Sequence, residues 1–192
     1  MSSGQAIVDA EEPVRHVLTV DDFLKLDGAG AFSTLGIVEL VDGEIFVLSP
    51  LYSPHGRAMA DLCTDINMAI RRAHLELVVH SPVSAWMDEH SLPQPDIVVT
   101  STAADKWVTP DMVRLVVEVS QSTLRHEMQR KAALYARGGV PEYWIADLKG
   151  RRIVRMHRPA GEHYGERAEF AFGDTVPSAT IDALTVDTTA LV

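Results

Sequence analysis

The chain has 192 residues, which favours one domain with a substantial buried core. Its formal net charge of −10 argues against broad nonspecific binding to nucleic acid, because such binding depends on many phosphate-neutralising cations. The single cysteine, Cys63, excludes an internal disulfide and a cysteine-based zinc site. No stretch approaches the length of a membrane span and the start lacks the apolar segment of a signal peptide, so we expect a cytoplasmic protein.

The first half of the chain predicts a short capped helix, a β-hairpin and a long amphipathic helix. These elements cover residues 19–24, 37–48 and 53–73. Thr19 or Asp21 can cap the first helix, and Ser53 followed by Pro54 is a common helix start. The pair Asp42-Gly43 favours the hairpin, because a type I′ turn needs positive φ at both central residues.

The second half predicts strands and one further long helix. Strands are expected at residues 95–100, 114–119, 142–147 and 152–157, with one or two over residues 77–87 and weaker ones near residues 170–172 and 185–186. The helix covers residues 122–137, because Gly138-Gly139 and Pro141 follow it as a C-terminal signature. Residues 101–111 are expected to form a polar loop with at most a helical turn.

This order of elements predicts an α/β fold, an α+β arrangement around a mixed sheet. We expect a single domain over residues 1–192, because neither an internal repeat nor an interdomain linker interrupts the pattern. Its core should lie at about residues 37–158, with an N-terminal arm over residues 1–18 and a C-terminal extension over residues 159–192.

Two carboxylates stand where charge is least expected. Glu118 interrupts the apolar run of residues 115–119, and Asp96 precedes the apolar run of residues 97–99. Both runs are rich in β-branched residues and predict buried strands. Two buried carboxylates on neighbouring strands need a shared proton or a cation between them. We therefore expect Asp96 and Glu118 to bind a metal ion.

Lys131 lies on the apolar face of the second long helix, four residues after Glu127 and four before Tyr135. Its ammonium group can snorkel outward to solvent. Alternatively it reaches inward to the carboxylates, where it could hold a water molecule or offset phosphate charge. Glu127 has the spacing of an ordinary ion pair with Lys131 on a helix surface. Alternatively, it supports the site residues without contacting the substrate.

The arrangement of Asp96, Glu118 and Lys131 resembles the PD-(D/E)XK nuclease superfamily. In that superfamily the two acids bind magnesium and a lysine orients or activates the attacking water. The usual lysine position, two residues after the second acid, is occupied here by Ser120. Some branches carry the lysine on the following helix, where Lys131 stands.

A closer resemblance is to the Uma family of "putative restriction endonucleases". The segments that carry it are ELVDGEI at residues 39–45, Ser49-Pro50 with His55, QPD at 94–96, VEV at 117–119 and KAALYARGGVPEYWI at 131–145. Glu127 stands where this family commonly has an aspartate. The resemblance implies an αβββαβ core, with the N-terminal hairpin and flanking helices added to it, and a metal-dependent nuclease-like site.

Three further residues are candidates for the site. Glu39 and Glu44 share one face of the predicted hairpin. Either they are exposed charges on a half-solvated sheet, or one of them supplies a third acid. His55, in the first turn of its helix, either caps locally or binds a phosphate or water near the site.

The predicted function is a metal-dependent endonuclease that acts on nucleic acid, with DNA as the favoured substrate. Asp96, Glu118 and the carbonyl of Val119 would hold one Mg²⁺ or Mn²⁺, and Lys131 would position the attacking water. Two alternatives stay open: a catalytically idle nuclease-fold protein that binds a partner or forms a structural dimer, and a metal hydrolase of small phosphoesters. A homodimer is expected only by analogy with enzymes that cut both strands.

Overall fold

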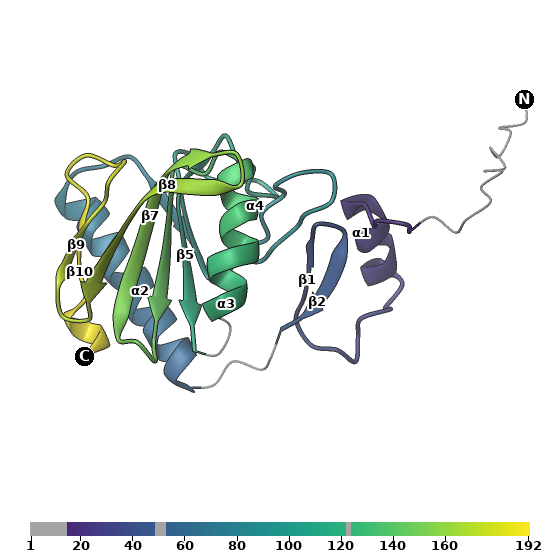
Figure 1. Ribbon diagram of the computed structural model, residues 1–192, viewed down its shortest axis with the longest axis horizontal. Coiled ribbons are helices and arrows are strands. Elements are labelled where there is room, and N and C mark those ends of the chain that lie inside the picture. Colours follow the sequence, from purple (N-terminus) through teal and green to yellow (C-terminus); the bar gives the residue numbers. More distant parts are fainter. Residues whose placement is uncertain (1–14, 49–52, 122–123) are drawn as a thin grey trace, which may run out of the picture.

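The computed structural model describes residues 15–48, 53–121 and 124–192, and its centre is a mixed six-stranded sheet (Figure 1). The strand order is β3-β4-β5-β6-β7-β8. The strands are β3 (Val78–His80), β4 (Ile97–Thr100), β5 (Val113–Ser120), β6 (Glu142–Asp147), β7 (Arg152–Ala160) and β8 (His163–Ala171). The pair β5 and β6 is parallel, and the other neighbours are antiparallel.

Helices cover both faces of this sheet. Helix α2 (Ser53–Arg72) packs on one face, against side chains such as Val117 and Trp144. On the other face lies a helical segment made of α3 (Leu124–His126), the π-helical turn η1 (Glu127–Lys131) and α4 (Ala132–Arg137). Because successive strand residues alternate between the two faces, β4, β5 and β6 are buried on both sides. This explains the nearly continuous apolar runs in their sequence.

The N-terminal part of the described chain forms a smaller layer beside the helical segment. It contains α1 (Val20–Gly28), capped by Thr19, and the hairpin β1 (Val38–Val41) and β2 (Glu44–Val47). Its turn residues Asp42 and Gly43 have φ of 52° and 71°, as a type I′ turn requires. Two backbone hydrogen bonds between Leu40 and Leu92, one in each direction, connect the hairpin to the rest of the fold.

The C-terminal part adds β9 (Thr175–Pro177), β10 (Thr185–Asp187) and the 3₁₀ turn η2 (Thr189–Leu191). The two short strands pair with each other, and β10 lies against α2. Among the described residues, none of the helices combines the length and apolarity that crossing a membrane requires.

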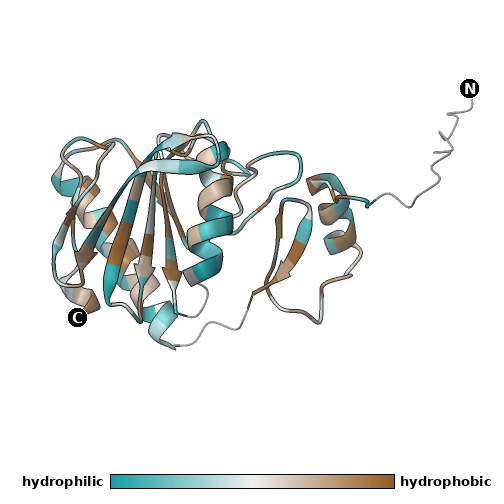
Figure 2. Ribbon diagram, viewed as in Figure 1, coloured by the Kyte–Doolittle hydropathy of each residue, from teal (hydrophilic) through white to brown (hydrophobic). Residues whose placement is uncertain are grey.

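Most of the predicted elements are present, and the differences have physical reasons. From α2 onward the order of elements is helix, three strands, helical segment and strand, as expected for the αβββαβ core. The strand expected near residues 170–172 is the end of the much longer β8, an edge strand that is mostly hydrophilic (Figure 2) and so lacks an apolar signal. Beyond β3, the segment to Met87 makes only an isolated bridge at Ala85 instead of a second strand. Residues 49–50 and 122–123, which belong to the predicted motifs, lie outside the described residues.

Candidate active site

The expected acids meet at one edge of the sheet, where β4 begins and β5 ends. The antiparallel register pairs Ile97 with Val117, which sets the preceding Asp96 beside Glu118. Helix α2 begins at the same edge, and Nε2 of its residue His55 lies 3.3 Å from Asp96 Oδ2. The edge is therefore built by segments that are far apart in the sequence.

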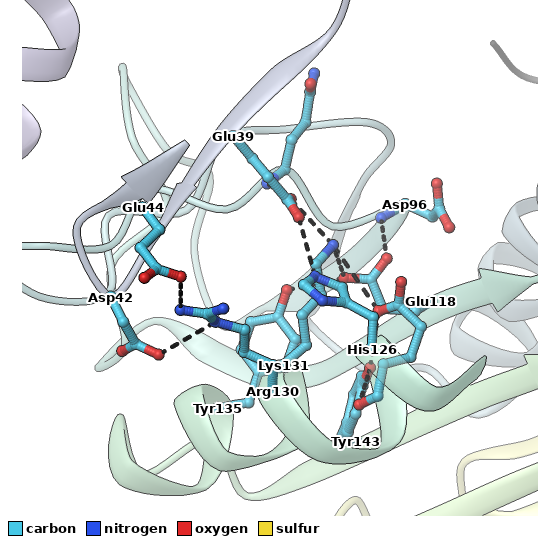
Figure 3. Close-up of polar contacts among 12 residues, drawn as sticks. Glu39, Asp42, Glu44, Asp96, Glu118, His126, Arg130, Lys131, Tyr135 and Tyr143 are labelled. Atoms are coloured by element: carbon cyan, nitrogen blue, oxygen red, sulfur yellow. Dashed lines mark hydrogen bonds and ion pairs between the residues drawn. The ribbon is translucent and has the colours of Figure 1, made fainter. Parts of the chain in front are cut away.

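Lys131 is the centre of this site (Figure 3). Its side chain is 3% exposed, and its Nζ lies 3.0 Å from Glu39 Oε2 and 3.1 Å from Glu118 Oε1. Glu127 Oε2 is 3.9 Å away. The ammonium thus points inward, and the alternative of a lysine that snorkels to solvent is wrong. Burial lowers the pKa of Lys131, but Glu118, Glu127 and Glu39 outweigh that effect and hold the pKa well above its usual value.

Glu118 projects from β5 into the same cluster. Its Oε1 also accepts a hydrogen bond of 2.9 Å from the hydroxyl of Tyr135, and its Oε2 accepts one of 3.3 Å from the backbone N–H of Asp96. Burial raises the pKa of Glu118 well above its usual value, and the neighbouring Glu127 and Asp96 raise it further. The attraction of Lys131 offsets this only in part. Ionisation of Glu118 is therefore unfavourable at this position, as the sequence predicted.

Asp96 is nearer the surface, with a side chain that is 15% exposed. Its Oδ2 accepts a hydrogen bond of 2.7 Å from the N–H of Val119 and lies beside His55. The hydrogen bond to Asp96 raises the pKa of His55, although partial burial opposes that effect. The other ring nitrogen of His55, Nδ1, is buried without a hydrogen-bond partner among the described residues. His55 is thus oriented at the acidic edge, and a role limited to capping its own helix does not describe it.

Glu39 supplies the third acid from the hairpin. Its side chain is fully buried, so the alternative of an exposed charge is wrong for Glu39. The backbone N–H of Gln94 donates to its Oε2, and His126 Nε2 lies 3.6 Å from its Oε1. Burial pushes the pKa of Glu39 up, but Lys131 and His126 outweigh burial and lower it.

Glu127 is buried behind Lys131, so it is not the ordinary surface ion pair that its spacing also allowed. The hydroxyl of Tyr143 lies 3.4 Å from its Oε2. Burial raises the pKa of Glu127, and Lys131 counteracts this. A single ammonium is thus shared by three buried glutamates.

Two other predicted residues lie apart from these contacts. Glu44 pairs with Arg130, at 2.6 Å, and with Arg15, and forms a separate ion-pair group with Asp42 (Figure 3). Ser120 is buried at the end of β5, where its carbonyl accepts the N–H of Leu148. Glu44 thus lies outside the group around Lys131. Ser120 connects the end of β5 to Leu148 through its backbone carbonyl.

Sequence reasoning missed the polar roles of Tyr135 and His126. The apolar face of the helix predicts only a packing role for Tyr135, although its position four residues after Lys131 puts both side chains on that face. His126 carried no signal, because residues five apart point about 140° away from each other in an α-helix. The π-helical turn η1, with its wider i to i+5 hydrogen bonding, lets both His126 and Lys131 reach Glu39.

The oxygen donors at this edge fit a divalent metal ion in kind. The carboxylates of Asp96 and Glu118 and the carbonyl of Val119 are hard ligands of the type that Mg²⁺ and Mn²⁺ prefer. Within the described ranges, no group of three or more His, Cys, Asp or Glu side chains is arranged to hold an ion. The expected site has only two such side chains, because its third ligand is a backbone carbonyl. The hydrogen bond from the N–H of Asp96 to Glu118 holds these two residues side by side.

Comparisons with known proteins agree with this geometry. The family described as "Putative restriction endonuclease" matches residues 20–189. The fold is similar to the crystal structure of "a putative nuclease belonging to DUF820" from Anabaena variabilis ATCC 29413, with a TM-score of 0.66 and 16% identity over 91% of this chain and 97% of that chain. No curated protein matches. The expected mixed α/β nuclease fold is confirmed, and since the family match spans most of the sequence, the chain belongs to the Uma2 restriction-endonuclease-like family.

Proposed function

We propose that this protein is a metal-dependent endonuclease that hydrolyses phosphodiester bonds in nucleic acid, with DNA as the favoured substrate. The observation that carries the proposal is the buried Lys131, held between Glu118 and Glu39 beside Asp96. Such a cluster is expensive to bury and adds little stability by itself, so a chemical role is the better account of it. Membership of a nuclease-like family supports the same reaction class.

Each residue has a distinct part in the proposed reaction. Asp96, Glu118 and the Val119 carbonyl would hold Mg²⁺ or Mn²⁺. A divalent ion there would lower the pKa of a bound water and neutralise phosphate charge. Lys131 positions the attacking water or balances charge on the phosphorus centre, and Glu39 and Glu127 hold its ammonium in place.

His55 acts on the same edge through Asp96. Its Nε2 lies 3.3 Å from Asp96 Oδ2 and its Nδ1 is buried, so its part in the proposed site is to hold the Asp96 carboxylate in place for the metal ion.

Basic side chains near this edge support a polyanionic substrate despite the acidic total charge. Lys149 and Arg151 are exposed in the turn between β6 and β7, and this turn is bonded to the end of β5 through Leu148 and Ser120. Arg57, 80% exposed, lines a pocket of about 270 Å³ together with Arg151. We define Arg57, Lys149 and Arg151 as the basic rim, and we infer that it contacts phosphates beside the one that is cleaved.

The proposal is tested by incubating the purified protein with plasmid DNA, single-stranded DNA and RNA, with Mg²⁺, Mn²⁺ or a chelator. We expect cleavage of at least one substrate only with a metal ion, and its loss in Glu118→Gln. Thermal unfolding of the same samples should show a metal-dependent rise in Tm that Glu118→Gln abolishes. A protein that binds neither metal contradicts the proposal.

A second candidate function is a catalytically idle nuclease fold that binds a partner. It is favoured by the fact that Lys131 and Tyr135 already contact Glu118 without a metal ion. The metal titration separates the two candidates, because an idle site that is complete by itself gains no stability from Mn²⁺. The expected homodimer is a proposal for either candidate, and sedimentation of the intact chain tests it.

A further inference from the structure

One oxygen of Glu118 is occupied by two buried donors. Its Oε1 accepts the hydroxyl of Tyr135 at 2.9 Å and the ammonium of Lys131 at 3.1 Å. Its other oxygen, Oε2, lies instead beside the backbone N–H of Asp96, at 3.3 Å. The carboxylate is therefore asymmetric, with one oxygen turned to the helical segment and the other to the second acid.

Lysine alone does not fix this orientation. The ammonium of Lys131 is shared with Glu39 and Glu127, so three carboxylates compete for one flexible cation. The terminal torsion of a glutamate is broad and roughly two-fold, so a second and stiffer donor is needed to hold one rotation.

Tyr135 has the rigidity that this task needs. Its side chain is fully buried, and its ring packs edge-on against Tyr143 with the ring centres 5.0 Å apart. It follows Lys131 by four residues, so both donors stand on one helix face, one above the other. The phenol hydroxyl is thus held at one place by the packing of its ring.

We propose that Tyr135 is a positioning residue, whose hydroxyl holds Oε1 of Glu118 so that Oε2 is presented to the divalent ion beside Asp96. This inference rests on the proposed function, because it concerns the same metal site. Tyr135 would thus affect the affinity for the metal ion. The attack on phosphorus would still be made by the bound water, which Lys131 positions. Tyr135→Phe should consequently weaken metal binding without removing turnover at saturating metal.

The test is a calorimetric titration of metal-free protein with Mn²⁺, followed by cleavage rates at rising Mn²⁺. We expect Tyr135→Phe to raise the apparent Kd for Mn²⁺ about 10-fold or more, as loss of a partner that orients a ligand does. Its kcat should approach that of the wild type once the metal saturates. A merely structural role of Tyr135 would lower Tm and leave the apparent Kd unchanged.

The matched control is Tyr164→Phe, which removes a hydroxyl whose hydrogen-bond partner is the backbone carbonyl of Val140 instead of a carboxylate. This variant should bind Mn²⁺ like the wild type. If Tyr135→Phe folds poorly, both variants are titrated at low temperature, where the folded fraction is high, and the apparent Kd is compared per folded molecule.

Two results would overturn the inference, and they are distinguishable. If wild type binds Mn²⁺ and Tyr135→Phe binds it equally well, the positioning role fails while the proposed function stands. If wild type itself binds no Mn²⁺, both fail together.

Discussion

Two glutamates on the neighbouring strands β5 and β6 are buried to nearly the same extent but have opposite surroundings. Glu142 is fully buried and accepts hydrogen bonds from the side chains of Trp144, Ser178 and Thr180, at 2.6, 2.6 and 2.8 Å. Backbone N–H groups of residues 179 and 180 add further donors. Each of these donors is neutral, and together they leave this carboxylate well satisfied where it stands.

Glu118 is satisfied in another way, by a lysine that it must share. Its nearest charged neighbours include three other carboxylates, those of Glu127, Asp96 and Glu39, and these raise its pKa in addition to the effect of burial. Since β5 and β6 run parallel, Glu142 at the start of β6 and Glu118 near the end of β5 also lie toward opposite edges of the sheet. Burial of an acid alone therefore does not single out a site, and the proposed function rests instead on the crowding of acids around one cation.

The largest expected effect comes from Glu118→Gln. The substitution removes a proposed metal ligand, so the cleavage rate should fall about 10²–10³-fold or more. The free energy of unfolding at neutral pH should stay equal or increase, because a crowded negative charge is relieved. Gel-based cleavage assays and urea unfolding measure the two quantities. Cleavage at the wild-type rate would contradict the assignment of Glu118, and Asp96→Asn offers an independent check on the other ligand.

Glu142→Gln should show the reverse pattern. An amide cannot accept from all of the donors around Glu142, so the free energy of unfolding should drop by about 2–4 kcal/mol. Turnover per folded molecule should be preserved, because the carboxylate has no part in the proposed site. Urea unfolding combined with cleavage assays at low temperature checks this, and a selective loss of rate would break the distinction between the two glutamates.

The pH dependence of stability should differ at the crowded site. Burial raises the pKa values of Glu118 and Glu127 above the ordinary value of 4.5, so the folded protein holds protons that the unfolded chain releases. Their stabilising contribution is complete below 4.5 and is lost as pH rises through the folded pKa values. Urea unfolding in chelator from about pH 5 to about pH 8 should show this decline, with a shallower slope in Glu118→Gln. An unchanged slope in that variant would contradict a raised pKa of Glu118 in the folded protein.

The sequence predicted the positions of the acids better than their partners. Glu118 stood out because an apolar strand run is a local signal, and Asp42-Gly43 fixed the hairpin for the same reason. Alternation placed Glu39 and Glu44 on one hairpin face, but it could not tell which of them the helical segment would cover. That depends on tertiary packing, which buries Glu39 against Lys131 and leaves Glu44 with Arg130.

Two other features depend on long-range context. The π-helical turn brings His126 and Lys131 to one acid, and neither residue type predicts such a turn. Strand β8 is recognisable only by its pairing with β7, since an edge strand with alternating charges has no apolar run to detect.

The smallest expected effect concerns the basic rim. It extends the comparison of the two glutamates from the acids to the surface that would contact the substrate. Changing Arg151 to Ala removes one proposed phosphate contact, so the affinity for DNA should fall moderately and the slope of log K against log salt should decrease by about one. Arg71→Ala is the matched control, because Arg71 is an exposed arginine near the opposite end of α2. Fluorescence anisotropy with labelled DNA at several salt concentrations, in Ca²⁺ or chelator to prevent cleavage, gives both slopes. Equal slopes for the two variants would mean that DNA does not cross the rim and that the substrate approaches the acids from another side.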